Sequence, residues 1–554
     1  MSKVFGIDLG TTNSVIATLD DSGQAIIIQN LLEGKDTLPS VVYFEDGQPV
    51  VVGGQAISSA EIYPDRVIKE IKRDIGKTNG RTVNFNGTEE GPIEISAYIL
   101  KRLADYAKDQ NYDVKDVVIT VPAYFGIPER NATRQAGIMA GFNEPIIVNE
   151  PTAAAIFHCH GQIGNKKIFV YDLGGGTFDI SIIDMTTDSD GVVQIKIIDT
   201  GGNDELGGTD WNKRLSNYMK HEYAEQEGIS VDDIKPNITY KIETAAETVK
   251  FALSQMMQRN ISIPSMKDDG EAVRINITRD KFNEITADLV DQTITKVNEL
   301  LEKANLKPDD IDTVLLVGGS TNMPIIKEKV AEIFPGENKV YQSDSNLAVA
   351  KGAALLAKIT LKQEEDSVPG PVPGPEPVLP KPELIVIDIL PRSVGVLANL
   401  ELSDGKYYNA VDNLLYKGAK NPATNTKDDY FAPKDGGFTA AFFENNLTVE
   451  GDLDDHYIKI QETDKDYNKI GDQCFIDDTL ANRYIGELNF MDAEIKSDDE
   501  IIVKLDLSLS GLWADVTHKK TGKTDRLDLT SATLRTKEEV TAAKERIKRI
   551  GTTG

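Results

Sequence analysis

Two copies of one short pattern constrain this chain more than any other feature. Residues 5–12 read Phe-Gly-Ile-Asp-Leu-Gly-Thr-Thr, and residues 169–177 read Phe-Val-Tyr-Asp-Leu-Gly-Gly-Gly-Thr. Each copy is an apolar stretch that ends in an aspartate and turns through glycine and threonine. A second apolar stretch follows each turn, at 14–19 and at 178–183. The repetition predicts a duplicated domain with two similar halves.

The residue types in this pattern suit a phosphate group and a metal ion. Glycine permits a tight turn and lets backbone N–H groups approach a phosphate closely, and threonine adds hydroxyl donors. The two aspartates, Asp8 and Asp172, can hold a hydrated Mg²⁺. We therefore expect the two halves to close on one nucleotide. The alternative is a pair of unrelated hairpin turns, because Asp-x-Gly is common in turns.

Length and charge narrow the class of protein. A chain of 554 residues has room for about three or four domains and a large core. Its 89 acidic against 60 basic residues leave a net charge of −29, which argues against nucleic acid or an anionic membrane as a partner. Cys159 and Cys474 predict no disulfide framework, and no apolar run reaches the ~18 residues of a membrane helix. We expect a soluble, cytoplasmic protein.

The first part of the chain alternates between two kinds of apolar pattern. Short apolar runs at 117–121 and 314–317 are typical of buried strands, whereas 95–110 and 129–141 have helical spacing. This alternation predicts an α/β architecture over residues 1–360. A third glycine turn, Gly-Gly-Ser at 318–320, follows the last of these strands, and a base or ribose could pack against its exposed backbone.

Composition changes abruptly after residue 360. Seven prolines between Pro369 and Pro382 predict an extended spacer, with an SH3-type ligand as the alternative. The apolar sequence Leu-Ile-Val-Ile-Asp at 384–388 follows, so we assign residues 361–388 to a spacer and linker. That apolar sequence can be a docking segment between domains or merely an edge strand.

The remainder of the chain predicts β structure and one helix. Leucines at 505, 507 and 509 alternate with polar residues, and turn clusters interrupt the region, so we expect an antiparallel β domain over residues 389–530. Thr536 and Glu539 have the spacing of a capping box. Apolar residues then recur at helical intervals until Gly551, which predicts a short helix within residues 531–554.

Five motifs in order resemble those of the 70-kilodalton heat-shock chaperone family, DnaK and its relatives. They are the two Asp-Leu-Gly loops, Val-Pro-Ala-Tyr-Phe at 121–125, Asn-Glu-Pro-Thr-Ala-Ala-Ala at 149–155 and Val-Gly-Gly-Ser-Thr at 317–321. The resemblance implies an actin-like duplicated ATPase domain with two lobes around a nucleotide cleft, followed by a substrate-binding β sandwich. The β region resembles the family less closely than residues 1–360 do.

The resemblance also implies roles for individual residues. Lys72 matches the lysine that contacts the γ-phosphate, Glu150 the carboxylate that positions the attacking water, and Asp8 and Asp172 the carboxylates that hold Mg²⁺ through its water shell. Without the motifs, Lys72 reads as a solvated lysine, and Glu247 with Lys250 as an exposed ion pair. The implied catalytic set is Lys72, Glu150, Asp172 and Thr177. The implied nucleotide-binding set is Gly10, Thr11, Thr12, Asn13, Gly174, Gly175, Gly176, Thr177, Gly207, Gly208, Glu247, Lys250, Phe251, Ser254, Gly318, Gly319, Ser320, Asn322 and Asn346.

The sequence departs from the family pattern at several of these positions. The family usually has arginine or isoleucine at the position of Phe251, arginine at that of Asn322 and aspartate at that of Asn346. We hypothesise that Phe251 packs against adenine. Thr209 and Asn203 replace a glutamate and an aspartate near the phosphates, so hydrolysis is expected to be slower or differently regulated.

The resemblance implies an ATP-dependent chaperone that hydrolyses ATP to control the binding of unfolded or apolar peptide segments. Its cofactors would be ATP or ADP, Mg²⁺ and K⁺, and its partners a J-domain co-chaperone and a nucleotide-exchange factor. Pro122 and Arg130 match the pair that relays nucleotide state, whereas Ile146 replaces the arginine that engages the J domain. The final helix is much shorter than the family's lid, which implies faster peptide exchange.

Two other functions remain open. The ATPase domain could gate a diverged β domain for a dedicated partner, which would make the chain a nucleotide-dependent scaffold with little general folding activity. A small-molecule kinase on the same fold is the third option.

Overall fold

The computed structural model describes residues 3–77, 79–189, 191–266, 272–342, 347–365, 384–387, 389–401, 407–445, 459–463, 483–508, 511–529 and 536–553. The expected proline-rich spacer, Asn346 and Cys474 lie outside these ranges. None of the helices in the described part of the chain is long and apolar enough to cross a membrane.

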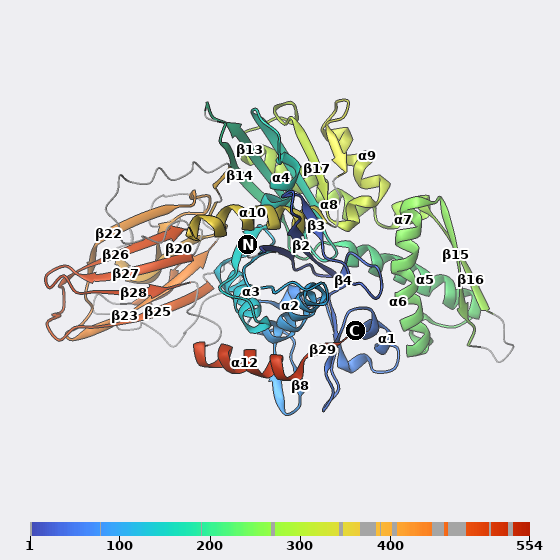
Figure 1. The fold of residues 1–554 in the computed structure, drawn as a ribbon, viewed down its shortest axis with the longest axis horizontal. Helices are drawn as coiled ribbons and strands as arrows, with labels where there is room; N and C mark the ends of the chain where they lie inside the picture. The colour runs from blue at the N-terminus through green and yellow to red at the C-terminus, as the bar shows by residue number, and fades with distance from the viewer. Residues whose placement is uncertain are drawn as a thin grey trace.

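Two sheets with the same topology form the larger part of the molecule (Figure 1). The first has the strand order β11-β10-β1-β2-β3, and β4 also pairs with β2. The second has the order β18-β17-β12-β13-β14, extended at its edge by β19. In the first sheet the strands are β1 (Phe5–Asp8), β2 (Asn13–Leu19), β3 (Ala25–Ile27), β4 (Leu38–Pro39), β10 (Val117–Val121) and β11 (Ile146–Asn149). In the second they are β12 (Lys166–Leu173), β13 (Phe178–Thr187), β14 (Val193–Asn203), β17 (Thr313–Val317), β18 (Val340–Gln342) and β19 (Leu384–Ile387).

The pairing confirms the duplication that the repeated pattern predicts. β1 pairs in parallel with β10 and antiparallel with β2, and β12 likewise pairs in parallel with β17 and antiparallel with β13. Asp8 therefore ends β1 where Asp172 nears the end of β12. Since the two sheets share one topology, their aspartate turns occupy equivalent positions.

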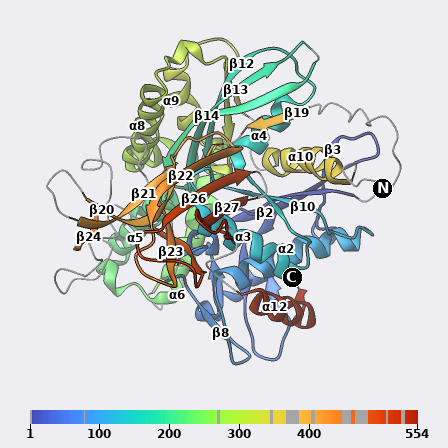
Figure 2. The ribbon, with the colours of Figure 1, turned by 90° about the vertical axis from the view of Figure 1, so that its left-hand side faces the viewer.

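Helices pack against both sheets, and each sheet with its helices forms one lobe (Figures 1 and 2). The first lobe buries α2 (Pro92–Asp109) and α3 (Ile127–Ala140) in its core. The second buries α5 (Gly208–Glu227), α6 (Pro236–Gln255), α8 (Ala287–Lys303) and α9 (Pro324–Ile333). Alanine-rich faces of α4 (Glu150–Cys159) and α10 (Ala348–Glu365) pack between the sheets, and α10 continues past the expected boundary at residue 360.

Small elements complete the two lobes. A short sheet joins β5 (Val41–Tyr43), β6 (Val50–Val52) and β7 (Val67–Lys69), with α1 (Gly54–Ser59) beside it. Two hairpins project from the lobes: β8 (Val83–Phe85) with β9 (Thr88–Glu90), and β15 (Gln258–Pro264) with β16 (Ala272–Thr278). The helix α7 (Arg279–Ile285) links the second hairpin to α8.

The apolar segment before the β region is docked on the second lobe. Leu384–Ile387 forms β19, which pairs in parallel with Val193 to Lys196 of β14. Leu384 and Val386 pack against the core between the lobes, while Ile385 is 36% exposed. The segment is thus both an edge strand and a docked connection, because alternate residues of a strand face opposite sides.

Two antiparallel sheets form a β sandwich beside the lobes (Figure 1). Their inward residues, among them Phe442, Phe490, Leu505 and Val516, share one core, as the period-two pattern predicts. The first sheet has the order β24 (Lys459–Thr463), β21 (Tyr407–Leu415), β20 (Ser393–Glu401), β23 (Gly437–Asn445) and β25 (Arg483–Met491). The second has the order β22 (Ala423–Phe431), β26 (Glu500–Ser508), β27 (Gly511–His518) and β28 (Thr524–Asp528).

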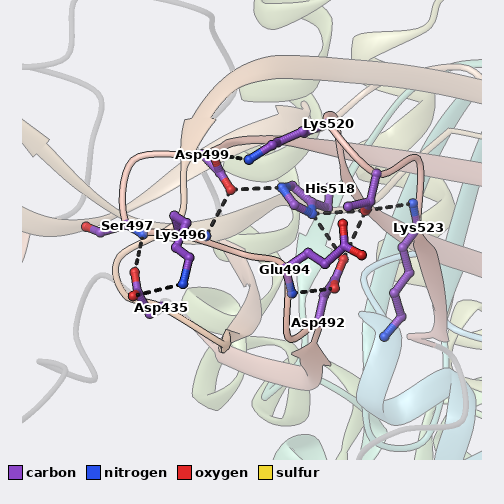
Figure 3. Close-up of polar contacts among 10 residues, drawn as sticks. Asp435, Asp492, Glu494, Lys496, Ser497, Asp499, His518, Lys520 and Lys523 are labelled. Carbon is purple, nitrogen blue, oxygen red and sulfur yellow. Dashed lines mark hydrogen bonds and ion pairs between the residues drawn. The ribbon is translucent and has the colours of Figure 1, made fainter.

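One end of the sandwich is tied together by a buried histidine (Figure 3). The side chain of His518 has no exposed surface, and its two ring nitrogens lie 3.0 Å from Asp492 Oδ2 and 3.2 Å from Asp499 Oδ2. The backbone N–H of Ser497 donates to Asp435 at 2.8 Å. These contacts connect the turn before β23, the loop before β26 and the end of β27.

The last described helix packs against the first lobe. Its capping box forms as predicted, with Thr536 and Glu539 bonded reciprocally, and α12 spans Lys537–Ile550. Val540, Ala543 and Ile547 join the core of the first lobe, and β29 (Thr552–Thr553) pairs in parallel with β6. The helix that we expected as a shortened lid over the sandwich therefore contributes to the first lobe.

Candidate functional site

A cavity of about 600 Å³ lies between the two lobes, within the range of small-molecule sites. The turns after β1 and β12 line it, together with the Gly318-Gly319-Ser320 turn after β17 and one face of α6. Lys72 and Glu150 also line it. All three glycine turns that the sequence singled out therefore meet at one place.

Lys72 and Glu150 form a buried ion pair in this cavity. Lys72 lies in a short 3₁₀ helix, and Glu150 is the first residue of α4. Lys72 Nζ donates to Glu150 Oε1 at 2.5 Å. Burial alone would lower the pKa of the Lys72 ammonium, but Glu150 and Asp8 outweigh it, so the pKa lies above its ordinary value. Lys72 is thus a held cation, and the interpretation as a solvated lysine is wrong.

Two acidic side chains, Asp8 and Asp172, line the cavity, and Asp179 lies near enough to Asp172 to interact with it electrostatically. Burial raises the pKa of Asp8 to about 7 and those of Asp172 and Asp179 well above their ordinary values, and Glu150 adds to each shift. Asp8 is desolvated by dense surroundings although it keeps some surface toward the cavity. Carboxylate oxygens in such a place suit a hard divalent cation. Within the part of the chain that the structure describes, no group of three or more His, Cys, Asp or Glu side chains is arranged to hold a metal ion.

The glycines of the second turn let the two turns touch. A Cβ on Gly175 would lie 2.3 Å from Thr12 Oγ1, so Gly175 allows the first turn to pack directly on it. The N–H groups of Gly208 and Thr209 donate to the carbonyls of Gly174 and Gly175 at 2.9 and 2.8 Å. The first residues of α5 therefore hold the second turn through these two backbone hydrogen bonds.

One face of α6 lines the cavity. Glu247, Lys250 and Ser254 share one helix face as their spacing predicts. Lys250 is buried and donates to Gly208 O at 2.8 Å, so it is not the exposed partner of Glu247 that the alternative interpretation requires. Burial lowers its pKa to about 8. Phe251 is 54% exposed at the rim, with Lys250 Nζ 5.5 Å from its ring centre.

The structure brings most of the predicted residues together. Among the predicted residues, the cavity is lined by Asp8, Gly10, Thr11, Thr12, Asn13, Lys72, Glu150, Asp172, Gly174, Gly175, Thr177, Glu247, Lys250, Phe251, Ser254, Gly318, Gly319, Ser320 and Asn322. Gly176, Gly207 and Gly208 are not among the lining residues: Gly207 packs on Gly176, and Gly208 on Ser320 and Lys250. The position of Asn346 is outside the described residues.

Some lining residues were not predicted as site residues. Thr209, which the sequence singled out only as a departure, lines the cavity and has a buried hydroxyl with no hydrogen-bond partner among the described residues. Thr37, Asn212 and Gln255 also line it. Asn212 lies one helical turn after Gly208, and Gln255 lies one helical turn after Phe251, so helical spacing could have found them, whereas Thr37 gives no signal.

A chain of hydrogen bonds leads from the cavity wall into α3. Asn149, which precedes Glu150, accepts a hydrogen bond from Arg130 Nη2, and Arg130 Nε donates to Phe125 O at 3.0 Å. On the other side of the cavity, Arg73 donates to Gly176 O at 2.6 Å. These bonds join the cavity to the first lobe and to the second turn.

Comparison with known proteins places the chain in a family. The family model described as "Hsp70 protein" matches residues 4–369. "Chaperone protein DnaK" of Thermosipho melanesiensis is 39% identical over 399 residues, and those of Thermosipho africanus and Thermotoga neapolitana are 38% identical over 398 and 400. Each alignment covers 71% of this chain and 63% of the relative's length. The family match and these identities show that the chain belongs to the Hsp70 protein family.

Proposed function

We propose that this protein is an ATP-dependent chaperone, which hydrolyses ATP to control the binding of unfolded or apolar peptide segments to its β sandwich. The observation that carries the proposal is the cavity between the lobes, where two glycine turns, two carboxylates and the Lys72–Glu150 pair converge. Family membership and relatives named as chaperones support it.

The chemistry of the proposed site follows from its charges. Phosphoryl transfer spreads negative charge over the transferred group, so a fixed cation and backbone donors stabilise the transition state. Lys72 is such a cation, and Glu150, which holds it, is a carboxylate that can orient a water. Asp8 and Asp172 would hold Mg²⁺ through its waters, and the ion would supply charge that neutralises the phosphates.

We assign the adenosine end of the site to α6 and the Gly318-Gly319 turn. Phe251 offers an exposed aromatic face at the rim of the cavity, and stacking of a base on an aromatic side chain is worth roughly 1–3 kcal/mol. Phe251→Ala should therefore weaken ATP binding about fivefold or more in calorimetry. Unchanged affinity would remove Phe251 from the adenine site.

The decisive experiment measures steady-state ATP hydrolysis with and without an apolar peptide. We expect peptide to stimulate the intact chain and to lose its effect in Val386→Asp, because a charge there opposes docking of β19. Ile385→Asp is the matched control, since Ile385 lies on the exposed face of the same strand. A measurable rate that peptide never changes would instead favour the nucleotide-dependent scaffold, and sugar phosphorylation in a coupled assay would favour the kinase.

Partners and further ions belong to the same proposal. K⁺, a J-domain co-chaperone and a nucleotide-exchange factor are carried over from the family. Ile146 is partly buried on β11, in place of a charged residue, so we expect a J-domain protein to stimulate hydrolysis less than in relatives that carry arginine. Restoring the charge with Ile146→Arg, read as stimulated turnover, tests this expectation.

A further inference from the structure

The contact between the β sandwich and the first lobe is centred on one buried carboxylate, Glu444. It lies near the end of β23, and only 1% of its side chain is exposed. Its Oε2 accepts a hydrogen bond from the backbone N–H of Ile127 at 2.9 Å. Ile127 is the first residue of α3, so a carboxylate from the sandwich caps a helix of the lobe.

The helix cannot supply this cap locally. Its N-cap residue is Gly126, which has no side chain to accept a hydrogen bond, although the first N–H groups of a helix need acceptors and favour negative charge. A Cβ on Gly126 would lie 2.4 Å from Glu444 Oε1. The missing side chain at Gly126 therefore makes room for the carboxylate that replaces it.

Charged groups from each neighbouring element face Glu444. Its Oε1 lies 3.6 Å from Arg483 Nη1 on β25 and 3.8 Å from Arg392 Nε before β20. Glu129 of α3 shares Arg483, which also donates to Gly76 O at 2.6 Å. Glu444 Oε1 and Glu129 Oε2 have no hydrogen-bond partner among the described residues. Two carboxylates thus compete for the same guanidinium, and each has one oxygen that accepts no hydrogen bond from the described residues.

We propose that Glu444 is the positioning residue of this interdomain contact, and that its protonation controls how firmly the β sandwich docks on the first lobe. The neutral acid still accepts from Ile127 N–H and removes the repulsion between Glu444 and Glu129. The ionised form keeps the cap but leaves a buried charge with two guanidiniums beyond hydrogen-bond distance. Protonation therefore strengthens docking, and this inference does not depend on the proposed ATPase activity.

The pH range follows from the surroundings of Glu444. Burial, reinforced by Glu129 and opposed by Arg392 and Arg483, raises the pKa of Glu444 from 4.5 to about 7. When the sandwich is undocked, the side chain meets water and returns to its ordinary pKa. Docking is then strongest below pH 4.5 and is lost progressively as pH rises through 7. Between pH 6 and pH 8 the docking equilibrium constant should fall about tenfold.

Amide hydrogen exchange of residues 125–132 in the full chain, without nucleotide, tests the proposal. After correction for the intrinsic pH dependence, the protection of Ile127 should be about tenfold lower at pH 8 than at pH 6. Glu444→Gln keeps a hydrogen-bond acceptor that does not titrate, so the amide of Ile127 should be protected at both pH values in this variant. Glu444→Ala removes the cap and should be poorly protected at both. Glu487→Gln, on the exposed face of β25, should behave as the parent does.

Two results would overturn the proposal. One is a Glu444→Gln variant that retains the parent's pH step, and the other is a parent chain with equal protection at both pH values. Because the measurement requires no ATP turnover, a failure of the chaperone function would leave its outcome unchanged.

Discussion

A buried ion pair helps to attach α12 to the first lobe. Arg546 forms a bidentate ion pair with Glu90 of β9, with N–O distances of 3.0 and 2.9 Å. Glu90 has no exposed side-chain surface, whereas 23% of Arg546 is exposed. The perturbation is Arg546→Met, which keeps much of the apolar length of the side chain and removes its charge.

The magnitude follows from burial. Removing one partner of a buried pair costs roughly 3–5 kcal/mol because the other charge stays buried. Since Arg546 retains some contact with water, we expect the lower end, about 3 kcal/mol. Val540 and Ile547 remain buried in the first lobe and are worth about 4 kcal/mol together. The helix should therefore stay docked but open roughly a hundredfold more often.

Native-state hydrogen exchange of α12 measures this opening free energy directly. The exposed Arg549 on the same helix provides the control variant Arg549→Met, which should change little. The double variant Glu90→Gln/Arg546→Met removes both charges and should recover most of the loss. An effect of Arg546→Met below about 1 kcal/mol, or a double variant as unstable as the single one, would show that the Arg546–Glu90 pair does not hold the helix in place.

Three further predictions concern the cavity and the sandwich. Gly175→Ala forces the two turns apart, so its ATP affinity in calorimetry should fall at least about tenfold. The control Gly201→Ala should bind ATP as the parent does, because its added Cβ lies 3.5 Å from the nearest atom. Equal affinities of the two variants would contradict the packing argument. Lys250 loses its proton as pH rises through about 8, so nucleotide affinity should decline over that range in the parent and show no such step in Lys250→Met. Hydrogen bonds from the Glu494 N–H and from His518 lower the pKa of Asp492 to about 2. The stabilising effect of the ionised Asp492 is therefore present above pH 4 and is lost as pH falls through 2. In an NMR titration His518→Gln should raise the pKa of Asp492, and an unshifted pKa would exclude His518 as a cause.

Much of the cavity could be predicted because its residues lie in local motifs. A strand that ends in Asp-Leu-Gly-Thr carries its own turn, and the spacing of Glu247, Lys250 and Ser254 places them on one helix face. Thr37 could not be predicted, because it reaches the cavity through the path of a loop and no pattern around it differs from an ordinary turn.

The packing of α12 and of the β sandwich on the first lobe could not be predicted from the sequence, for a different reason. The period of Val540, Ala543 and Ile547 predicts an amphipathic helix, but an apolar stripe does not specify which surface it covers. Similarly, Glu444 is one acidic residue in a strand, and Gly126 one glycine before a helix. Their pairing exists only once the sandwich and the lobe are in contact, so no local signal records it.

The shared topology of the two sheets has a consequence for how the acidic pair of the cavity came to differ. Duplication of one ancestral half would create two carboxylates in matching places at once, with identical surroundings. Asp8 now pairs in register with Thr120, whose hydroxyl lies 3.5 Å from its carboxylate, whereas Asp172 pairs with Val317, which has no hydroxyl. The neighbours on the other side differ as well, because Asp8 pairs with Val15 whereas Asp172 pairs with Asp179, whose charge raises the pKa of Asp172 further. Two carboxylates in matching positions therefore lie in chemically different surroundings.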